Sequence, residues 1–364
     1  MVRIPSNIQE LVSYKPGKPV AEIVKELNLQ EWAVLWNNEN NLGPSPVVQK
    51  AIEQSLDRCH LYPDPTASVL CETIATLNDT DADHVTVDNG SESVFDCILR
   101  AFFEPRDELL TFEGTFVAVY IWAKSNNISC RKIPLMDDYQ FDVDGLIQST
   151  GPKTKAVYLA NPNNPTGAMI GSSEMRRLIK ELPKEVLIIV DEAYFEYAKA
   201  LNEDYPDSFQ LQAPNLITLR TLSKAYGIAG IRLGYALGEP RLIEAIRKVR
   251  MTFAPSNVAQ AAGVGALQDP AHMEHAVDVN STALQSIYPV LELAKLKYIE
   301  SYGNFVMLDL GTEEKALQFV DDMLRAGIFI RHLRAFGLPH CVRISTGTEK
   351  ENALLLQVLR LRHH

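Results

Sequence analysis

Short apolar runs alternate with amphipathic stretches through the middle of the chain. Four such runs occur, at 156–160, 186–190, 216–219 and 231–236. Near-continuous runs of β-branched and leucine residues are typical of strands that are buried on both faces. Between the first two runs, apolar residues recur at helical spacing over 172–179, and Ser172 or Ser173 is the predicted N-cap. This alternation predicts an α/β domain with a mainly parallel central sheet flanked by helices.

The last third of the chain follows a different pattern. The predicted elements are a helical tract at about 282–300, a strand at 304–310, a helix at 313–326 and strands at 328–331 and 341–345. This order predicts a smaller α+β domain. We therefore expect an N-terminal segment (1–44), a large domain (45–265) and a small C-terminal domain (266–364). The N-terminal segment is expected to be irregular and to wrap over the small domain or a partner subunit.

Composition and charge narrow the range of functions. A chain of 364 residues is long enough for about two domains. The formal charge of −11 argues against a nucleic-acid or anionic-membrane surface. The five cysteines form no C-x-x-C pair, which is typical of a reduced, metal-free protein. No apolar stretch is long enough for a membrane span or a signal peptide. We expect a cytoplasmic protein with neither a nucleic-acid nor a membrane partner.

Three segments of the alternating region carry residues that suit one cofactor. Lys224 lies in the segment TLSKAYG (221–227), and Arg232 follows eight residues later. Upstream are the turn NPNNPTG (161–167) and Asp191, which closes an apolar run. A lysine amine and a carboxylate for a ring nitrogen are the groups that hold pyridoxal 5'-phosphate (PLP) in enzymes. Because ligands of parallel sheets gather at the carboxyl ends of the strands, these groups are expected to converge.

Each of these signals alone has an ordinary explanation, as a surface lysine, a turn or a capping aspartate. In this order and on these elements, they predict a PLP site. Lys224 is the predicted nucleophile and proton shuttle, since burial and a nearby cation lower the pKa of an amine. Asp191 is expected to keep the ring nitrogen protonated. Asn164 and Tyr194 are suited to hydrogen-bond the phenolic oxygen.

The phosphate of the cofactor needs hydrogen-bond donors. The segment 89–93 precedes an amphipathic helix pattern, and a helix N-terminus presents free N–H groups to an anion. Ser91 is the predicted contact there, whereas Glu92 fits only if its carboxylate points away from the phosphate. The other predicted cofactor contacts are Thr221, Ser223 and Arg232 at the phosphate and Phe116 on the ring face.

These residues resemble the motifs of fold type I, class I and II aminotransferases. Within that family the chain is most similar to the histidinol-phosphate aminotransferases. The match extends over nearly the whole chain, through the segments 14–19, 38–40, 61–64, 221–225, 229–232 and 342–347. The resemblance implies an aspartate aminotransferase-like fold with a large PLP-binding domain. It also implies ping-pong transamination between a small-molecule amino donor and a 2-oxo acid acceptor.

The same resemblance assigns roles to single residues. Lys224 would form the Schiff base with the cofactor. Tyr62 would reach the cofactor phosphate of the neighbouring subunit, which implies a homodimer with shared active sites. Arg343 would bind the acidic group of the substrate, assisted by Arg331 and Tyr14, because a guanidinium donates two parallel hydrogen bonds to such a group.

Three positions differ from the family pattern. Phe116 stands where the family usually has tyrosine, the phosphate turn reads GSES (90–93), and the segment 38–41 reads NENN. These differences bear on the substrate more than on the cofactor.

The predicted reaction converts L-histidinol phosphate and 2-oxoglutarate to imidazole acetol phosphate and L-glutamate. Two alternatives remain on the same scaffold, an aromatic amino-acid aminotransferase and a PLP-dependent decarboxylase of a phosphorylated amino acid. The sequence barely separates them, because the reaction depends on which Cα bond stands perpendicular to the cofactor ring. A non-catalytic cofactor-binding module is disfavoured, since the lysine, the aspartate and the arginines are all intact.

Overall fold

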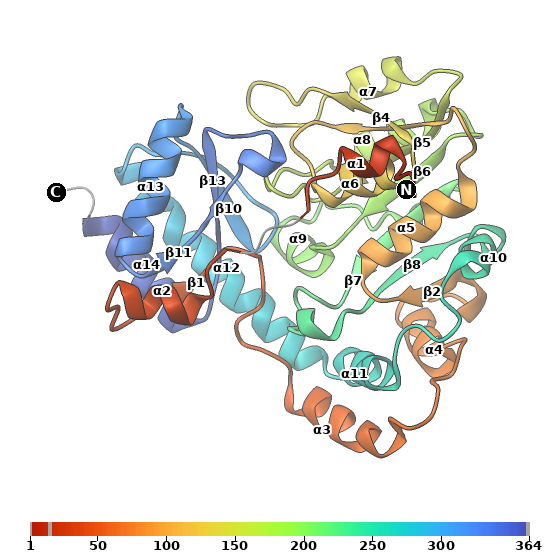
Figure 1. Ribbon diagram of the computed structural model, residues 1–364, viewed down its shortest axis with the longest axis horizontal. Helices are drawn as coiled ribbons and strands as arrows, with labels where there is room; N and C mark the ends of the chain where they lie inside the picture. The colour runs from red at the N-terminus through yellow and green to blue at the C-terminus, as the bar shows by residue number, and fades with distance from the viewer. Residues whose placement is uncertain (1, 14–16, 362–364) are drawn as a thin grey trace.

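The computed structural model describes residues 2–13 and 17–361. A seven-stranded sheet forms the centre of the larger half of the molecule (Figure 1). Its strands, in spatial order, are β2 (Val85–Asp88), β8 (Gly234–Gly238), β7 (Leu216–Thr221), β6 (Leu187–Asp191), β5 (Thr154–Ala160), β3 (Glu108–Phe112) and β4 (Ser129–Ile133). Only β8 runs antiparallel to its neighbours, so the sheet is mainly parallel, as predicted.

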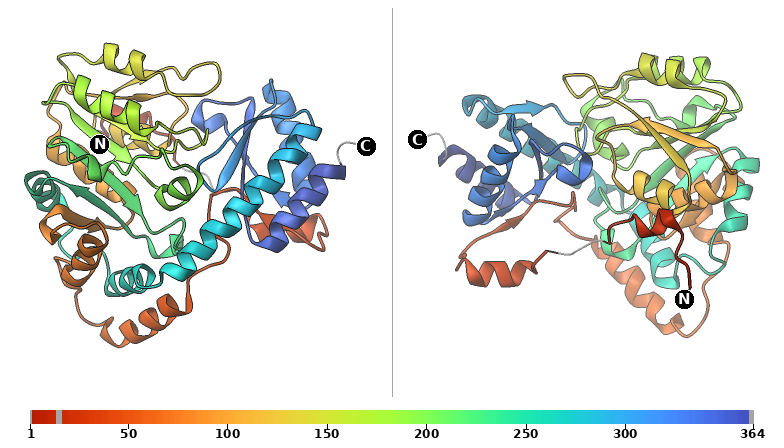
Figure 2. Two further views of the ribbon diagram at one scale, coloured as in Figure 1. Left: turned by 180° about the vertical axis from the view of Figure 1, so that it is seen from behind. Right: turned by 45° about the horizontal axis from the view of Figure 1, so that its top comes forward.

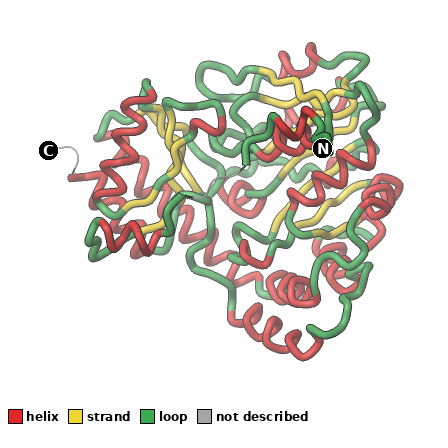
Figure 3. Tube along the Cα trace, viewed as in Figure 1, coloured by secondary structure: helices red, strands yellow, loops and turns green. Residues whose placement is uncertain are grey.

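Helices cover both faces of this sheet (Figure 3). One face packs against α5 (Ser91–Phe102), α6 (Ala118–Ser125) and α10 (Pro240–Val249), and the opposite face against α7 (Val143–Ser149) and α8 (Ser172–Glu181). A further layer is built from α3 (Pro46–Ser55), α4 (Ser68–Leu77) and α11 (Asn257–Leu267). Because the central strands are apolar on both sides, burial on both faces is what their sequence requires.

The smaller half is built on a four-stranded antiparallel sheet. Its order is β12 (Arg331–His332), β13 (Cys341–Ser345), β10 (Phe305–Asp309) and β9 (Lys297–Ile299). Its helices are α12 (Pro270–Leu293), α13 (Glu313–Arg325) and α14 (Glu349–Leu361). Helix α12 runs from the larger half into the smaller one, and both halves are visible in the views of Figure 2. The α+β character predicted for this part is confirmed, while the exact domain limits stay a prediction.

The N-terminal segment bridges the two halves. Its α1 (Ser6–Gln9) lies against α6, where Asn7 donates to the carbonyls of Lys124 and Ser125. Further on, α2 (Val20–Glu26) is followed by β1 (Ala33–Val34), which pairs in parallel with β11 (Ile328–Phe329). The expectation of an irregular segment is therefore wrong in part, since it contains two helices and a strand. The contact with the C-terminal part agrees with the prediction.

Three other predicted details are wrong. The strand expected at 231–236 begins at Gly234, because η4 (Ala229–Ile231) precedes it and Arg232 adopts a left-handed conformation with φ +60°. The helix expected at 282–300 ends at Leu293. Neither Ser172 nor Ser173 is an N-cap, since Gly171 holds that position and Ser172 Oγ donates to the Asp204 carbonyl. The remaining 3₁₀ turns are η1 (Leu56–Arg58), η2 (Ala82–His84), η3 (Phe209–Leu211) and η5 (Arg334–Phe336), and α9 spans Phe195–Leu201.

Candidate active site

A cavity lies where the carboxyl ends of β5, β6 and β7 meet the N-terminus of α5. Its walls contain every predicted cofactor-binding residue except Tyr62. The lining residues are Ser91, Glu92, Phe116, Ala160, Pro162, Asn164, Asp191, Ala193, Tyr194, Thr221, Ser223, Lys224 and Arg232. Residues separated by more than 130 positions in the chain are therefore assembled by the parallel order of the strands.

Lys224 follows β7 and is half-buried in this cavity. Its Nζ donates to the Asn37 carbonyl at 3.2 Å. Burial, together with the cations Arg343 and Arg232, lowers the pKa of Lys224 to about 8, while the charges of Glu39 and Asp191 act in the opposite direction. A larger neutral fraction of the amine at neutral pH makes it a better nucleophile and base.

Asp191 is the last residue of β6 and is 7% exposed. Its Oδ2 accepts a hydrogen bond from the Tyr158 hydroxyl at 2.7 Å, and its Oδ1 accepts from the Ala193 amide at 3.1 Å. Burial raises the pKa of Asp191 to about 6, while these two hydrogen bonds and the charge of Lys224 act in the opposite direction. A buried carboxylate with lone pairs left over is a suitable partner for a protonated ring nitrogen.

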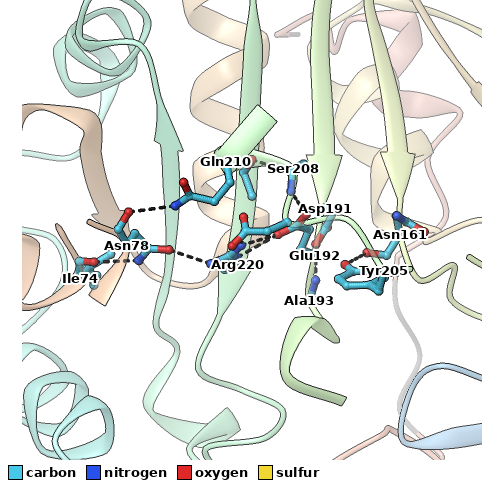
Figure 4. Close-up of polar contacts among 12 residues, drawn as sticks. Ile74, Asn78, Asn161, Asp191, Glu192, Ala193, Tyr205, Ser208, Gln210 and Arg220 are labelled. Carbon is cyan, nitrogen blue, oxygen red and sulfur yellow. Dashed lines mark hydrogen bonds and ion pairs between the residues drawn. The ribbon is translucent and has the colours of Figure 1, made fainter. Parts of the chain in front are cut away.

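The adjacent carboxylate, Glu192, serves a structural network instead. Its Oε2 accepts from Nε and Nη2 of the buried Arg220, at 2.9 and 2.8 Å. Arg220 also donates to Asp207 and Asn78, and Figure 4 shows this network beside Asp191 and its Ala193 contact. Successive side chains of a strand point in opposite directions, so of the two neighbouring acids only Asp191 lines the cavity.

The opposite end of the cavity is built to receive an anion. Among the described residues, the backbone N–H groups of Ser91 and Glu92 at the start of α5 have no acceptor. Arg232 Nη1 lies 3.4 Å from Ser223 Oγ, and Thr221 Oγ1 lies 3.0 Å from the same hydroxyl. Free amides at a helix N-terminus, two hydroxyls and a guanidinium form a donor set that fits a phosphate.

Glycines bring these donors together. A Cβ on Gly90, where φ is +92°, would lie 2.7 Å from Arg232 Nη2. A Cβ on Gly234 would lie 2.1 Å from the Ser91 amide nitrogen, a clash with backbone that cannot move aside. The close approach of β8, Arg232 and the first turn of α5 therefore depends on the absence of both side chains.

Glu92 does not oppose an anion at this point. Its Oε1 accepts a hydrogen bond from the Trp122 indole Nε1 at 2.7 Å. Trp122 belongs to α6, so a neighbouring helix holds the carboxylate. Glu92 was expected to fit only if its carboxylate points away from the phosphate. Trp122, which was not predicted to take part, holds the carboxylate by this hydrogen bond.

A buried arginine contacts the cavity residue Asn164. Arg343 is 4% exposed, donates to Asn164 Oδ1 and to the Trp36 carbonyl, and has no acceptor for its Nε among the described residues. Burial lowers its pKa to about 10, and the like charge of Arg331, its neighbour across β12 and β13, acts in the same direction. A buried cation without a carboxylate partner favours the binding of an anionic group.

Among the described residues that were predicted to bind the cofactor, Tyr62 alone does not line the cavity. Tyr62 is 79% exposed and stacks on Phe253, with 4.3 Å between the ring centroids. Tyr14 lies outside the described residues. Two contacts were not foreseen: Asn38 Nδ2 donates to the Tyr194 hydroxyl at 2.8 Å, and Tyr158 donates to Asp191. No local sequence signal marks either contact, because each joins segments far apart in the chain.

The sequence was compared with known protein families and proteins. The sequence model of the family "Aminotransferase class I and II" matches residues 30–359. A histidinol-phosphate aminotransferase of Geobacillus sp. (strain WCH70) is 36% identical over 361 residues, which cover 98% of this chain and 97% of the relative. Another, from Caldicellulosiruptor saccharolyticus, is 35% identical over 97% of this chain and 98% of its own.

Solved structures agree with this result. The histidinol-phosphate aminotransferase of Sinorhizobium meliloti, determined in complex with pyridoxal-5'-phosphate, superposes with a TM-score of 0.89 at 29% identity, over 100% of this chain and 98% of that one. A Thermus thermophilus aspartate aminotransferase superposes with a TM-score of 0.85 at 21% identity, over all of both chains. The predicted aspartate aminotransferase-like fold is thereby confirmed. None of the helices in the described ranges is long and apolar enough to cross a membrane.

Proposed function

Because the chain belongs to the class I and II aminotransferases, we propose that it transfers the amino group of L-histidinol phosphate to 2-oxoglutarate. Family membership and the Sinorhizobium meliloti complex support PLP as the cofactor. The observation that carries the substrate assignment is the similarity to histidinol-phosphate aminotransferases over nearly the whole chain. The products would be imidazole acetol phosphate and L-glutamate.

The residues of the cavity suit the cofactor in a definite orientation. Asp191 would face the ring nitrogen, Asn164 and Tyr194 would face the phenolic oxygen, and Phe116 would lie against the ring. The first turn of α5 and its neighbouring donors would hold the phosphate, through Ser91, Thr221, Ser223 and Arg232. Bound there, PLP supplies an electron sink for the bond broken at the substrate Cα.

Lys224 performs the proton transfer in this proposal. With a pKa of about 8, about one amine in ten is neutral at pH 7, compared with far fewer for an ordinary lysine. Its Nζ takes the proton from the substrate Cα. The ammonium group holds this proton until it is delivered to the C4′ carbon of the cofactor. The cations that surround Lys224 favour the neutral amine, and so keep it available as a base.

Arg343 and Arg331 provide the anion site for the substrate. Arg343 is held by Asn164 and Trp36, so its planar group is oriented before any ligand arrives. Substrates of both half-reactions are acidic, since one carries a phosphate and the other two carboxylates. A shared cationic site explains how one cavity serves both in turn.

We further propose a homodimer located in the cytoplasm. The exposed Tyr62 would reach the cofactor phosphate of the partner subunit. Several apolar side chains are exposed close to Tyr62 in sequence or stacked on it, and their burial between two subunits would support this dimer. They are Leu56, Leu61, Val69, Met251 and Phe253.

Half-reactions of the purified, PLP-loaded protein test the substrate. L-Glutamate and L-histidinol phosphate are each expected to bleach the visible absorption of the bound cofactor, and 2-oxoglutarate to restore it. Bleaching by L-phenylalanine with histidinol phosphate inert would indicate the aromatic aminotransferase. Turnover of a phosphorylated amino acid with release of CO₂ and no need for 2-oxoglutarate would indicate the decarboxylase.

The Lys224→Ala variant tests the chemistry itself. Loss of the amine is expected to abolish the visible absorption of the cofactor and to reduce turnover by at least about 10³-fold. Arg343→Ala serves as the matched control next to the cavity, since it is expected to raise KM for acidic substrates while the cofactor absorption persists. Full turnover by the Lys224→Ala variant would contradict the mechanism.

A further inference from the structure

A hydrogen bond connects the core of the large sheet to the ionisable centre of the cavity. The Tyr158 hydroxyl donates to Asp191 Oδ2 at 2.7 Å. Tyr158 is 1% exposed and does not line the cavity, so it does not touch a bound ligand. Any influence on the chemistry must pass through Asp191.

The strand register sets this contact. In the parallel pair of β5 and β6, Ala160 lies beside Asp191 and Tyr158 beside Ile189. Side chains two residues apart on a strand share one face, so Tyr158 and Asp191 point to the same side of the sheet. The long tyrosine side chain thereby spans the two positions along the strand that separate it from the acid.

Packing holds the tyrosine hydroxyl in place. The ring of Phe95, from α5, meets the Tyr158 ring edge to face at a centroid distance of 5.2 Å. The Tyr158 carbonyl accepts from Thr111 Oγ1 on β3 at 2.9 Å. Both the ring and the backbone of Tyr158 are therefore fixed by elements that also frame the cavity.

We propose that Tyr158 is a positioning residue that keeps Asp191 ionised and correctly oriented toward the ring nitrogen of the cofactor. This inference rests on the proposed function, because it concerns the group that Asp191 would hold. With Oδ2 bound to Tyr158 and Oδ1 to the Ala193 amide, the carboxylate plane is fixed and each oxygen keeps a further lone pair.

The charges around Asp191 make the tyrosine important. Burial favours the neutral acid and Glu92 acts in the same direction, while Lys224 favours the carboxylate. The hydroxyl of Tyr194 is buried nearby, and Asp191 contributes to its raised pKa. Among the influences that hold the pKa of Asp191 down, the hydrogen bond from Tyr158 is the largest. Its loss therefore shifts the proton toward the carboxyl group and away from the ring nitrogen.

The Tyr158→Phe variant tests this inference, since it keeps the ring against Phe95 and removes only the hydroxyl. In the apoprotein, the pKa of Asp191 is expected to rise from about 6 by about one unit. The dissociation constant of PLP should increase about twofold at pH 7 and about tenfold at pH 5, because one pKa unit has its full effect only where Asp191 is mostly protonated in both proteins. With PLP labelled with ¹⁵N at the ring, the chemical shift should move toward that of an unprotonated nitrogen.

Two further variants separate positioning from structure. Tyr205→Phe removes another buried hydroxyl, which donates to the Asn161 carbonyl, and should leave the nitrogen shift unchanged. In an Asp191→Asn background, Tyr158→Phe should have no further effect on the pH dependence of PLP binding. Replacement of Tyr158 by 3-fluorotyrosine, a stronger donor that retains the hydroxyl, should lower the pKa of Asp191 and provides the test should Tyr158→Phe fail to fold.

The outcomes are distinct. If wild-type protein bound no PLP, the proposed function would fail. If the wild type bound PLP and both Tyr158 variants reproduced its ring-nitrogen shift and pH profile, the proposed role of Tyr158 alone would be overturned.

Discussion

At the level of single residues, burial shifts the two central ionisable groups of the cavity in opposite directions. It lowers the pKa of Lys224 to about 8 and raises that of Asp191 to about 6. Low polarity disfavours the charged form of each group, and neighbouring charges then adjust the result. Both values lie close to neutral pH, where small changes in the surroundings alter the protonation state.

The pH dependence of amine reactivity checks this arrangement. Apoprotein should react with pyridoxal, which lacks the phosphate. The rate should rise with pH as the amine of Lys224 loses its proton, and the midpoint of this rise should lie near pH 8. Removal of a positive charge favours the protonated amine, so Arg343→Gln should move the midpoint to higher pH. Arg343→Lys keeps the charge and should not. A midpoint unaffected by either substitution would show that Arg343 does not act on Lys224.

The indole of Trp122 allows a second test at this scale. Trp122→Phe removes the donor that holds Glu92 and frees its carboxylate beside the anion site. The dissociation constant of PLP should rise about tenfold, or ~1.4 kcal/mol. Glu92→Gln should restore most of the affinity in the Trp122→Phe protein, since it removes the charge. Equal losses in the single and double variants would mean that Trp122 acts only through packing.

At the level of elements, the site depends on how closely a helix approaches a strand. The first turn of α5 lies against β8, and the contact involves Gly234 and the backbone of Gly90 and Ser91. This approach directs the free amides of α5 into the cavity next to Arg232. The helix contributes its N-terminal partial charge and its unpaired donors only in this position.

The Gly234→Ala variant probes this approach. The new Cβ would displace the Ser91 backbone, so we expect stability to fall by about 1–3 kcal/mol. PLP affinity should fall by at least about tenfold, because a hydrogen bond to a charged group is worth about 1.5–3 kcal/mol. Gly230→Ala is the control, since a Cβ there meets nothing within 4 Å. Unchanged affinity in a folded Gly234→Ala protein would show that α5 tolerates the shift.

At the level of the whole molecule, side-chain hydrogen bonds join the two halves. Tyr139, from the larger half, bonds through its hydroxyl to Asp309 at 3.0 Å and to His340 Nε2 at 2.9 Å. Arg343 comes from the small sheet yet bonds to Asn164 at the edge of the large sheet. The proposed substrate site would thus draw on both halves, and in the proposed homodimer Tyr62 of a second copy would complete it.

Mixed dimers test the shared site. Lys224→Ala and Tyr62→Ala subunits, each nearly inactive alone, are to be co-expressed with different tags and the mixed dimer isolated. With shared sites, one of its two sites combines an intact Lys224 with an intact partner Tyr62, so about half of the wild-type activity is expected. If each site were built from one subunit only, the mixed dimer would stay inactive.

The sequence by itself determined the chemistry of the site and the class of fold. The convergence of Lys224, Asp191 and Asn164 on one cavity could be predicted because each lies at the end of an apolar run, and the carboxyl ends of parallel strands lie at one edge of a sheet. Their types then restricted the cofactor. The apolar runs also predicted β5, β6 and β7, since burial on both faces requires such composition.

Only the tertiary structure decided how these residues are tuned and oriented. The contacts of Tyr158 with Asp191, Trp122 with Glu92 and Asn38 with Tyr194 span 33, 30 and 156 positions, and no local pattern encodes them. The pKa values of Lys224 and Asp191 depend on burial, which exists only once the chain has packed. Local composition selects the groups that can react, while strand register and helix packing set the distances and the polarity at which they do so.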